Sequence, residues 1–196
     1  MTETSNPYRA PDAVLDSTAG EETYEPSVFS SKGRIGRMRF IAYMTGIYLV
    51  TLGLLFVIGL VSGFDAFANA DFEAFSVPLL IGAAVFYIGL TVVAIVFGKR
   101  RLNDLNRSGW WLLLFFAPGI LSAINEMLGL VAFIPYLALT IYMLFFSGSS
   151  GSNNYGPAPA ANSTGVLILA WLAIAMLALA VVGMILAILI PQFAGA

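Results

Sequence analysis

Long stretches without a charged residue limit what this sequence can fold into. Residues 40–62 form a run of 23 residues with no acidic or basic side chain, and residues 77–97 and 165–190 form two more. A helix rises about 1.5 Å per residue, so each run is long enough to cross the roughly 30 Å of hydrocarbon in a bilayer. Since 59% of all residues are hydrophobic and only 10% are charged, we expect an all-α, polytopic integral membrane protein.

A fourth run, residues 110–146, is too long for a single crossing. Glu126 is its only charged residue, and as one helix it would measure about 55 Å. We place a reversal at Asn125–Glu126, which gives spans at 110–124 and 127–146. Pro118–Gly119 lies inside the first of these and favours a kinked or re-entrant segment. The sequence therefore predicts about five transmembrane helices, or four if residues 110–146 cross only once.

The first 28 residues have a different composition. They contain three prolines, one arginine and six acidic residues: Glu3, Asp12, Asp16, Glu21, Glu22 and Glu25. Such a segment buries too little apolar surface to fold by itself. We expect residues 1–28 to be a disordered acidic tail.

The distribution of basic residues predicts the orientation of the chain. All nine lie before the first span or between the second and third, and lysine and arginine are retained on the cytoplasmic side. We expect a cytosolic amino terminus. If residues 110–146 form a hairpin, the loop at 147–164 returns to the cytosolic face and the carboxyl terminus lies outside. With a single crossing, that loop lies outside and the carboxyl terminus inside.

Two basic segments at the predicted cytosolic face are candidates for a binding site. In the segment 29–40, Arg34 and Arg37 are three residues apart and would share a helix face, so they suit a lipid phosphate or a carboxylate. In the segment 99–111, Asp104 is the one acid among several bases and should pair with an arginine of either segment. Within its own segment the candidate partners are Arg100, Arg101 and Arg107. Ser108 can cap the next helix. The simpler interpretation is that these bases only orient the spans.

A third segment, 151–159, reads GSNNYGPAP. Asn153 can close a turn and Gly156 precedes a proline that fixes a bend, with Tyr155 between them. If the hairpin forms, this loop emerges on the same face as the two basic segments. The sequence then predicts one cytosolic polar site formed by Arg34, Arg37, Arg100, Arg101, Asp104, Ser108, Asn153, Tyr155 and Gly156.

These three segments, in this order, resemble the signature of the YhaH-like bacterial inner-membrane family, known as domain of unknown function 805. The matching residues are Gly33, Arg34, Arg37, Arg100, Arg101, Leu102, Asp104, Ser108, Gly109, Trp110, Trp111, Gly151, Asn153, Tyr155, Gly156, Pro157 and Pro159. The resemblance implies a membrane domain at 29–159, an extra carboxyl-terminal transmembrane helix within 160–196, and a multi-pass protein of the bacterial inner membrane. It implies no particular activity.

Several classes of function are disfavoured by what the sequence lacks. It contains no cysteine and no histidine, and its formal net charge is −2. We therefore expect no enzyme, no metal or cofactor, and no nucleic-acid partner. Ion-coupled transport would need ionisable groups inside the spans. The favoured role is a non-enzymatic binding or scaffold protein whose partners are anionic lipid headgroups, a membrane protein or further copies of the chain; the alternative is a small-solute transporter or channel subunit.

Overall fold

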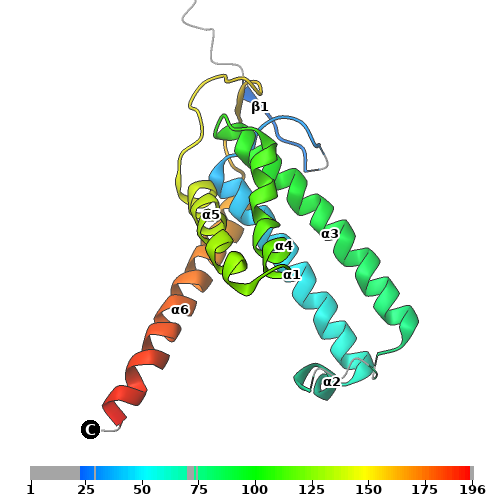
Figure 1. Cartoon of the computed structure of the whole chain (residues 1–196). Helices are drawn as coiled ribbons and strands as arrows, with labels where there is room; N and C mark the ends of the chain where they lie inside the picture. The colour runs from blue at the N-terminus through cyan, green and yellow to red at the C-terminus, as the bar shows by residue number, and fades with distance from the viewer. Residues whose placement is uncertain (1–22, 29, 70–72, 74, 195–196) are drawn as a thin grey trace, which may run out of the picture.

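The computed structural model describes residues 23–28, 30–69, 73 and 75–194. Within that part of the chain, four helices are long and apolar enough to cross a membrane: α1 (Arg37–Ser62), α3 (Val77–Asp104), α5 (Glu126–Phe145) and α6 (Thr164–Ala194) (Figure 1). The shorter elements are β1 (Thr23–Tyr24), α2 (Phe64–Ala68), the 3₁₀ helix η2 (Gly109–Phe115), α4 (Ala117–Ser122) and β2 (Ala158–Pro159). The prediction of an all-α, polytopic membrane protein is confirmed.

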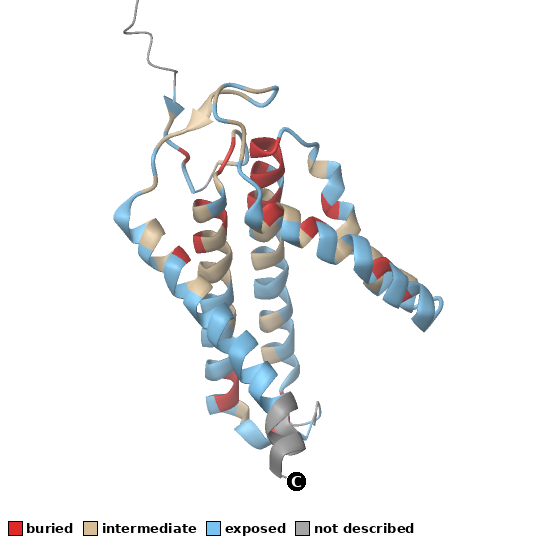
Figure 2. Ribbon diagram, turned by 90° about the vertical axis from the view of Figure 1, so that its left-hand side faces the viewer, coloured by how far each residue is buried: buried red, intermediate tan, exposed pale blue. Residues whose placement is uncertain are grey.

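The long helices carry their large apolar side chains on the outside. Leu60, Ile88 and Ile134 are each more than 60% exposed, as is normal for surfaces that face lipid. Buried residues concentrate at one end of the molecule (Figure 2). The main apolar core lies there, and it consists of Ile35, Phe40, Phe97, Leu102, Leu105, Leu112, Leu139 and Met143.

Helix α3 extends beyond the predicted span at 77–97, through the basic segment as far as Asp104. It ends in a Schellman motif, in which the N–H of Asn106 binds the carbonyl of Asn103 and the N–H of Arg107 binds the carbonyl of Leu102, at 3.1 and 2.8 Å. Asn106 has φ 55°, a left-handed conformation that asparagine tolerates better than most residues. The predicted span at 77–97 therefore ends seven residues too early.

The predicted span at 110–124 is not a long helix. It consists of η2 and α4, which together are too short to be counted with the four long helices. Pro118 lies in the first turn of α4, where proline is tolerated because its missing N–H has no helical partner. The predicted reversal at Asn125–Glu126 is confirmed, because the Asn125 side chain accepts a hydrogen bond from the Met127 N–H and caps α5. The resulting α4–α5 hairpin leans away from α1 and α3 (Figure 2).

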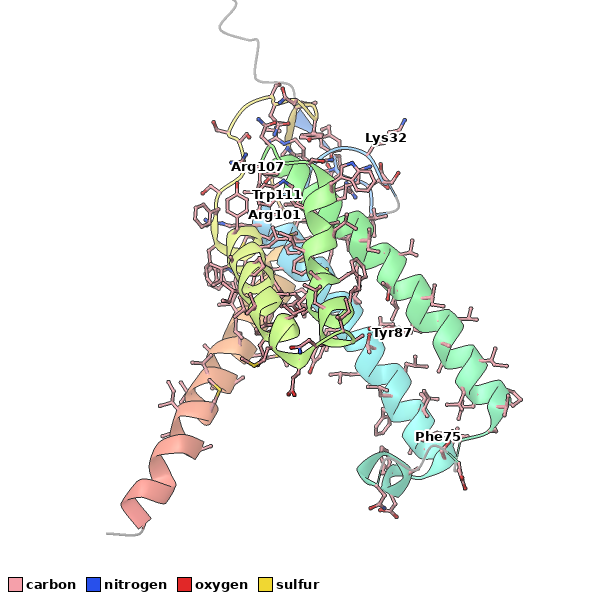
Figure 3. The ribbon with its side chains drawn as sticks, in the orientation of Figure 1. Lys32, Phe75, Tyr87, Arg101, Arg107 and Trp111 are labelled. Atoms are coloured by element: carbon pink, nitrogen blue, oxygen red, sulfur yellow. The ribbon has the colours of Figure 1, made fainter. Side chains whose placement is uncertain are left out.

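The start of α1 and the ends of α3 and α5 lie together at the end of the molecule that we call the basic end. Lys32, Arg101 and Arg107 all lie there, whereas Phe75 lies at the opposite end (Figure 3). The loop between α5 and α6 also contacts the basic end, because Ser149 N–H donates to the Asp104 main-chain carbonyl at 2.9 Å. The chain therefore reverses within residues 109–145, and α6 leads away from the basic end (Figure 1).

This arrangement predicts that the start of α1 and the end of α6 lie on opposite sides of the bilayer. With the basic end in the cytosol, α6 would carry the carboxyl terminus to the periplasm. A reporter that is active only in the cytosol should therefore be inactive when fused after Ala196 and active when fused after Ser150. Strong activity from the fusion after Ala196 would contradict the prediction.

Candidate functional site

Four arginine side chains are buried at the basic end. Arg34, Arg100 and Arg101 are fully buried and Arg39 is 3% exposed, whereas Asp104 is the one buried acid among the described residues. Arginine is almost never fully buried unless it has partners. The hydrogen bonds of these side chains therefore determine what the site can do.

Asp104 is held by two guanidinium groups. Arg34 donates from Nε and Nη2 to Oδ1 at 3.2 and 3.1 Å, and Arg101 donates from Nη1 to Oδ2 at 2.7 Å. Charge-assisted bonds of this kind are about twice as strong as neutral ones. The prediction that Asp104 pairs with an arginine is confirmed, and its partners come from both basic segments.

Arg34 joins the loop between α5 and α6 to the rest of the basic end. Besides its two bonds to Asp104, it donates from Nη2 to Ser149 O at 2.6 Å and from Nη1 to Gly151 O and Gly156 O at 2.7 and 3.1 Å. A guanidinium has five N–H groups, and here all five have an acceptor. Arg34 has no donor left for a ligand.

The carboxyl-terminal turn of α5 is capped by arginines from two other helices. Arg101 donates from Nε to Met143 O at 2.8 Å and from Nη2 to Phe146 O, and Arg37 donates from Nη1 to Phe145 O at 3.2 Å. The last carbonyls of a helix have no partner within it and carry a partial negative charge. Arginines at this position supply hydrogen-bond donors to these carbonyls and a positive charge beside them. They thereby hold α5 against α1 and α3.

The loop after α5 approaches Asp104 closely. Asn153 donates from Nδ2 to Asn103 O at 2.9 Å, and Asn103 donates from its own Nδ2 to Gly33 O at 3.2 Å. Gly148 lies directly against the Asp104 side chain, where a Cβ atom would overlap the carboxylate. The three polar segments predicted to meet are therefore brought together, and a glycine that the sequence pattern did not single out allows it.

Part of the predicted disordered tail contributes to the same cluster. Residues 1–22 lie outside the described residues, but Thr23–Tyr24 pairs in parallel with Ala158–Pro159. The Tyr24 hydroxyl accepts from Arg34 N at 2.6 Å and donates to Arg34 O, and Arg100 Nη1 donates to Ser27 O at 2.8 Å. The predicted tail boundary at residue 28 is therefore too late. An aromatic residue in an acidic segment is the only sequence signal of this contact.

Arg34 and Arg37 do not share a helix face, contrary to the prediction. Gly33 has φ +80° and the Tyr24 ring occupies the space beside it, so the chain bends there and α1 begins only at Arg37. Arg34 points into the buried cluster, whereas Arg37 is exposed.

Ser108, Tyr155 and Gly156 lie at the edge of the site. The Ser108 side chain caps η2 by accepting from Trp110 N, as predicted. Tyr155 is 37% exposed and only its main-chain N–H is bound, to Asn153 Oδ1. Gly156 has φ +112° and offers its carbonyl to Arg34. These three residues shape the loops around the buried arginines.

Four of the described basic residues are exposed around the buried cluster; we call Lys32, Arg37, Lys99 and Arg107 the rim bases. Arg107 lies over the Trp111 ring at 5.8 Å and its Nε is 3.5 Å from the Tyr142 hydroxyl. Glu25 is the one exposed acid among the residues described at this end. Over the part of the chain that the structure describes, the surface of the basic end is thus positively charged.

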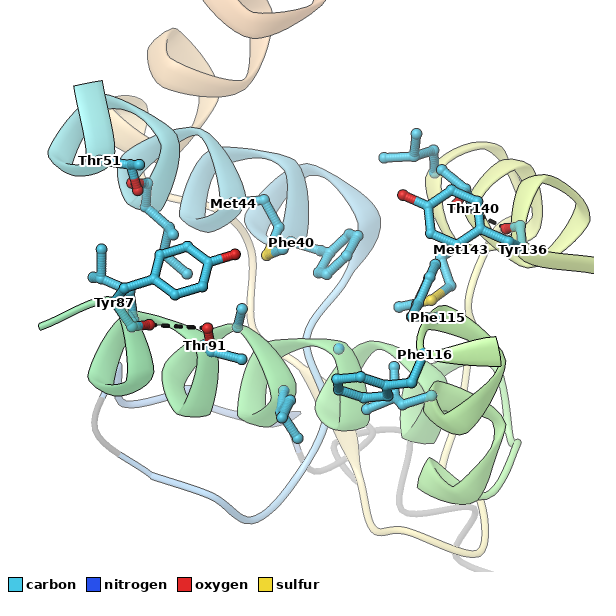
Figure 4. A pocket seen from close by; sticks show the side chains of 17 residues that line it. Phe40, Met44, Thr51, Tyr87, Thr91, Phe115, Phe116, Tyr136, Thr140 and Met143 are labelled. Carbon is cyan, nitrogen blue, oxygen red and sulfur yellow. Dashed lines mark hydrogen bonds between the residues drawn. The ribbon is translucent and has the colours of Figure 1, made fainter. Parts of the chain in front are cut away.

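Below the buried cluster, α1, α3, η2 and α5 line an apolar cleft of about 550 Å³. Tyr87 and Tyr136 line it together with Phe40, Met44 and Phe115, and Thr91 binds the Tyr87 carbonyl at its wall (Figure 4). No charged side chain of the described residues lines this cleft. It suits an apolar group such as a lipid chain.

Comparisons with known proteins agree with the three-segment pattern. The inner membrane protein YhaI of Escherichia coli strain K12 is 33% identical over 89 residues, which cover 42% of this chain and 63% of that protein. The YhaI protein of Escherichia coli O157:H7 gives the same values, so the match spans less than two thirds of these relatives. No solved structure matches. The sequence pattern of the family described as protein of unknown function (DUF805) matches residues 28–157, and the chain therefore belongs to the DUF805 family of integral membrane proteins.

Proposed function

We propose that this protein is a non-enzymatic binding protein of the bacterial inner membrane that holds anionic lipid headgroups at its basic end. The observation that carries the proposal is the division of the basic residues into two groups. Arg34 and Arg101 are buried and bound to Asp104 and to main-chain carbonyls, whereas the rim bases are exposed. The buried group holds the fold together, and the exposed group is available to lipid phosphates.

The chemistry of the cluster supports a role without catalysis. Asp104 is the one acid in it among the described residues, and two guanidinium groups occupy its carboxylate. A carboxylate held in this way is a poor general base, because its lone pairs already accept charged donors. The sequence also contains no histidine and no cysteine, the side chains that most readily serve as general base or nucleophile near neutral pH.

The surroundings of the rim bases support lipid as the partner. They lie at the ends of apolar helices, where phosphate groups are concentrated, and each exposed base near an anionic surface contributes about 1 kcal/mol. The YhaI relatives are inner membrane proteins, which supports the same location here with the basic end in the cytosol. The apolar spans contain no charged residue, which makes ion-coupled transport the weaker alternative.

The proposal is tested by identifying the lipids that remain bound after extraction in a mild detergent. We expect phosphatidylglycerol and cardiolipin to be enriched over their share of the membrane. Replacing all four rim bases with glutamine should remove that enrichment, because about 1 kcal/mol per base amounts to roughly 4 kcal/mol in total. Bound lipid with the composition of the bulk membrane would contradict the proposal, and a stoichiometric protein subunit in its place would favour the scaffold role.

A further inference from the structure

A second apolar cleft lies between α1 and α6 and differs from the first in having a charged end. It encloses about 610 Å³ and is closed on one side by the last residues of α5. The lining includes Arg37 and, below it, mainly apolar side chains such as Met38, Ile41, Tyr48, Trp171, Ile174 and Leu177. Its volume lies within the range of about 300–1,000 Å³ typical of ligand sites.

The length of this cleft matches one leaflet of a bilayer. Its α1 wall runs from Arg37 to Tyr48, and eleven residues of helix correspond to about 16 Å. The hydrocarbon core is about 30 Å thick, so the cleft reaches from the basic end to roughly the bilayer midplane. That is the depth that one acyl chain occupies when its headgroup lies at the surface.

Arg37 has unused donors at the polar end of the cleft. It is exposed and makes one hydrogen bond, from Nη1 to Phe145 O at 3.2 Å. No ion pair of Arg37 is found among the described residues, whereas Arg34 and Arg101 both pair with Asp104. A guanidinium binds phosphate through two parallel N–H bonds, and Arg37 retains four N–H groups for this purpose.

The opposite wall of the cleft adds an aromatic residue. Trp171 of α6 is 61% exposed and lines the cleft. Tryptophan prefers the interfacial region of a bilayer, where its ring contacts lipid chains and its N–H meets polar ester groups. Helix α6 lies beyond the residues matched by the family pattern, so this wall is an addition to the family domain.

We propose that the cleft between α1 and α6 seats one anionic phospholipid, with its phosphate on Arg37 and one acyl chain along the apolar lining. This inference rests on the proposed function and assigns it one defined site. Charge complementarity selects this cleft over the one in Figure 4, whose described lining has no base. The other rim bases then contribute only to the general attraction of anionic lipid.

The test uses the full chain in a mild detergent, with phosphatidylglycerol or phosphatidylcholine added and bound lipid counted by native mass spectrometry. We expect one phosphatidylglycerol to bind at least tenfold more tightly than phosphatidylcholine, a difference of about 1.4 kcal/mol. Arg37→Gln should abolish this preference. The complementary triple variant, Lys32→Gln with Lys99→Gln and Arg107→Gln, should keep the single tight lipid.

Filling the clefts provides a second, matched pair of variants. Ala173 lines the cleft with Arg37 and Ala94 lines the other, and both are partly buried. Ala173→Phe should displace the tight lipid, whereas Ala94→Phe should not; thermal unfolding of each variant shows whether it is folded. Arg37→Lys should restore part of the preference lost in Arg37→Gln.

The outcomes separate this inference from the proposed function. If Arg37→Gln and the triple variant lose anionic lipid in proportion to the charges removed, and Ala173→Phe has no effect, the single seat is refuted while general binding at the basic end stands. If the unchanged protein shows no preference for phosphatidylglycerol, both proposals fail.

Discussion

Replacing Asp104 with asparagine should lower the free energy of unfolding by about 3–5 kcal/mol, the usual cost of removing one partner from a buried ion pair. The change leaves the guanidinium groups of Arg34 and Arg101 buried without their counter-ion. Because Arg34 also binds the loop at Ser149–Gly156, we expect the loop to loosen with it. Thermal or denaturant unfolding of the purified protein in detergent measures the effect.

The control for this change lies at the other end of the molecule. Asp65 in α2 is exposed, and Asp65→Asn should change stability by less than about 0.5 kcal/mol, as surface substitutions usually do. Equal effects of the two variants would show that the Asp104 ion pairs contribute nothing to stability. A double change of Asp104→Asn with Arg34→Met should cost less than the sum of the single changes, because the two residues interact directly.

Gly148→Ala should be nearly as damaging although it adds only a methyl group. The new Cβ would overlap the Asp104 carboxylate, and that carboxylate cannot move aside without losing its bonds to Arg34 and Arg101. Overpacking of a closed site costs about 1–3 kcal/mol, and we expect the upper part of this range. The melting temperature should fall, and the loop at 147–163 should become more sensitive to protease.

A matched control is available at Gly165, where an added Cβ meets no atom within 4 Å. Gly165→Ala should leave stability unchanged or raise it slightly, because alanine favours the helix that begins there. If Gly148→Ala were also neutral, the close approach of the loop to Asp104 would not hold in solution.

The spans could be predicted from the sequence because the thickness of hydrocarbon dictates their length. The apolar runs at 40–62 and 77–97 both lie inside helices, and α3 was predicted to end seven residues too early. Charged residues at 99–104 gave no sign of helix continuation, because most partners of their buried side chains lie in distant segments, such as Ser27, Arg34 and the end of α5. The prediction of a long helix at 110–124 was wrong, because an apolar sequence shows only that the residues are buried or face lipid. It does not show how long a helix they form.

The meeting of the three polar segments could be predicted by counting membrane crossings. Which of their residues are buried and which are exposed could not. Arg34 and Arg37 look equivalent in the sequence, yet one is fully buried and the other exposed. The difference arises from the bend at Gly33 and from Tyr24, which lies in a segment predicted to be disordered. Burial of an arginine depends on acceptors supplied by distant segments, and local sequence does not report them.

The hydrogen bonds of Arg34 join parts of the chain that are synthesised at different times. Its acceptors in the last loop lie 115 to 122 residues further along the chain, and at synthesis rates of about 5–20 residues per second they emerge roughly 6 to 25 s after it. Asp104 lies only 70 residues after Arg34 and can pair with it before the loop emerges. Until Asp104 emerges, Arg34 is an unpaired cation and can help to retain the start of α1 on the side of the ribosome. Once the loop is synthesised, the same guanidinium is buried and binds three of its carbonyls. Arg34 can thus first help to orient the nascent chain and later hold the last loop against the folded protein.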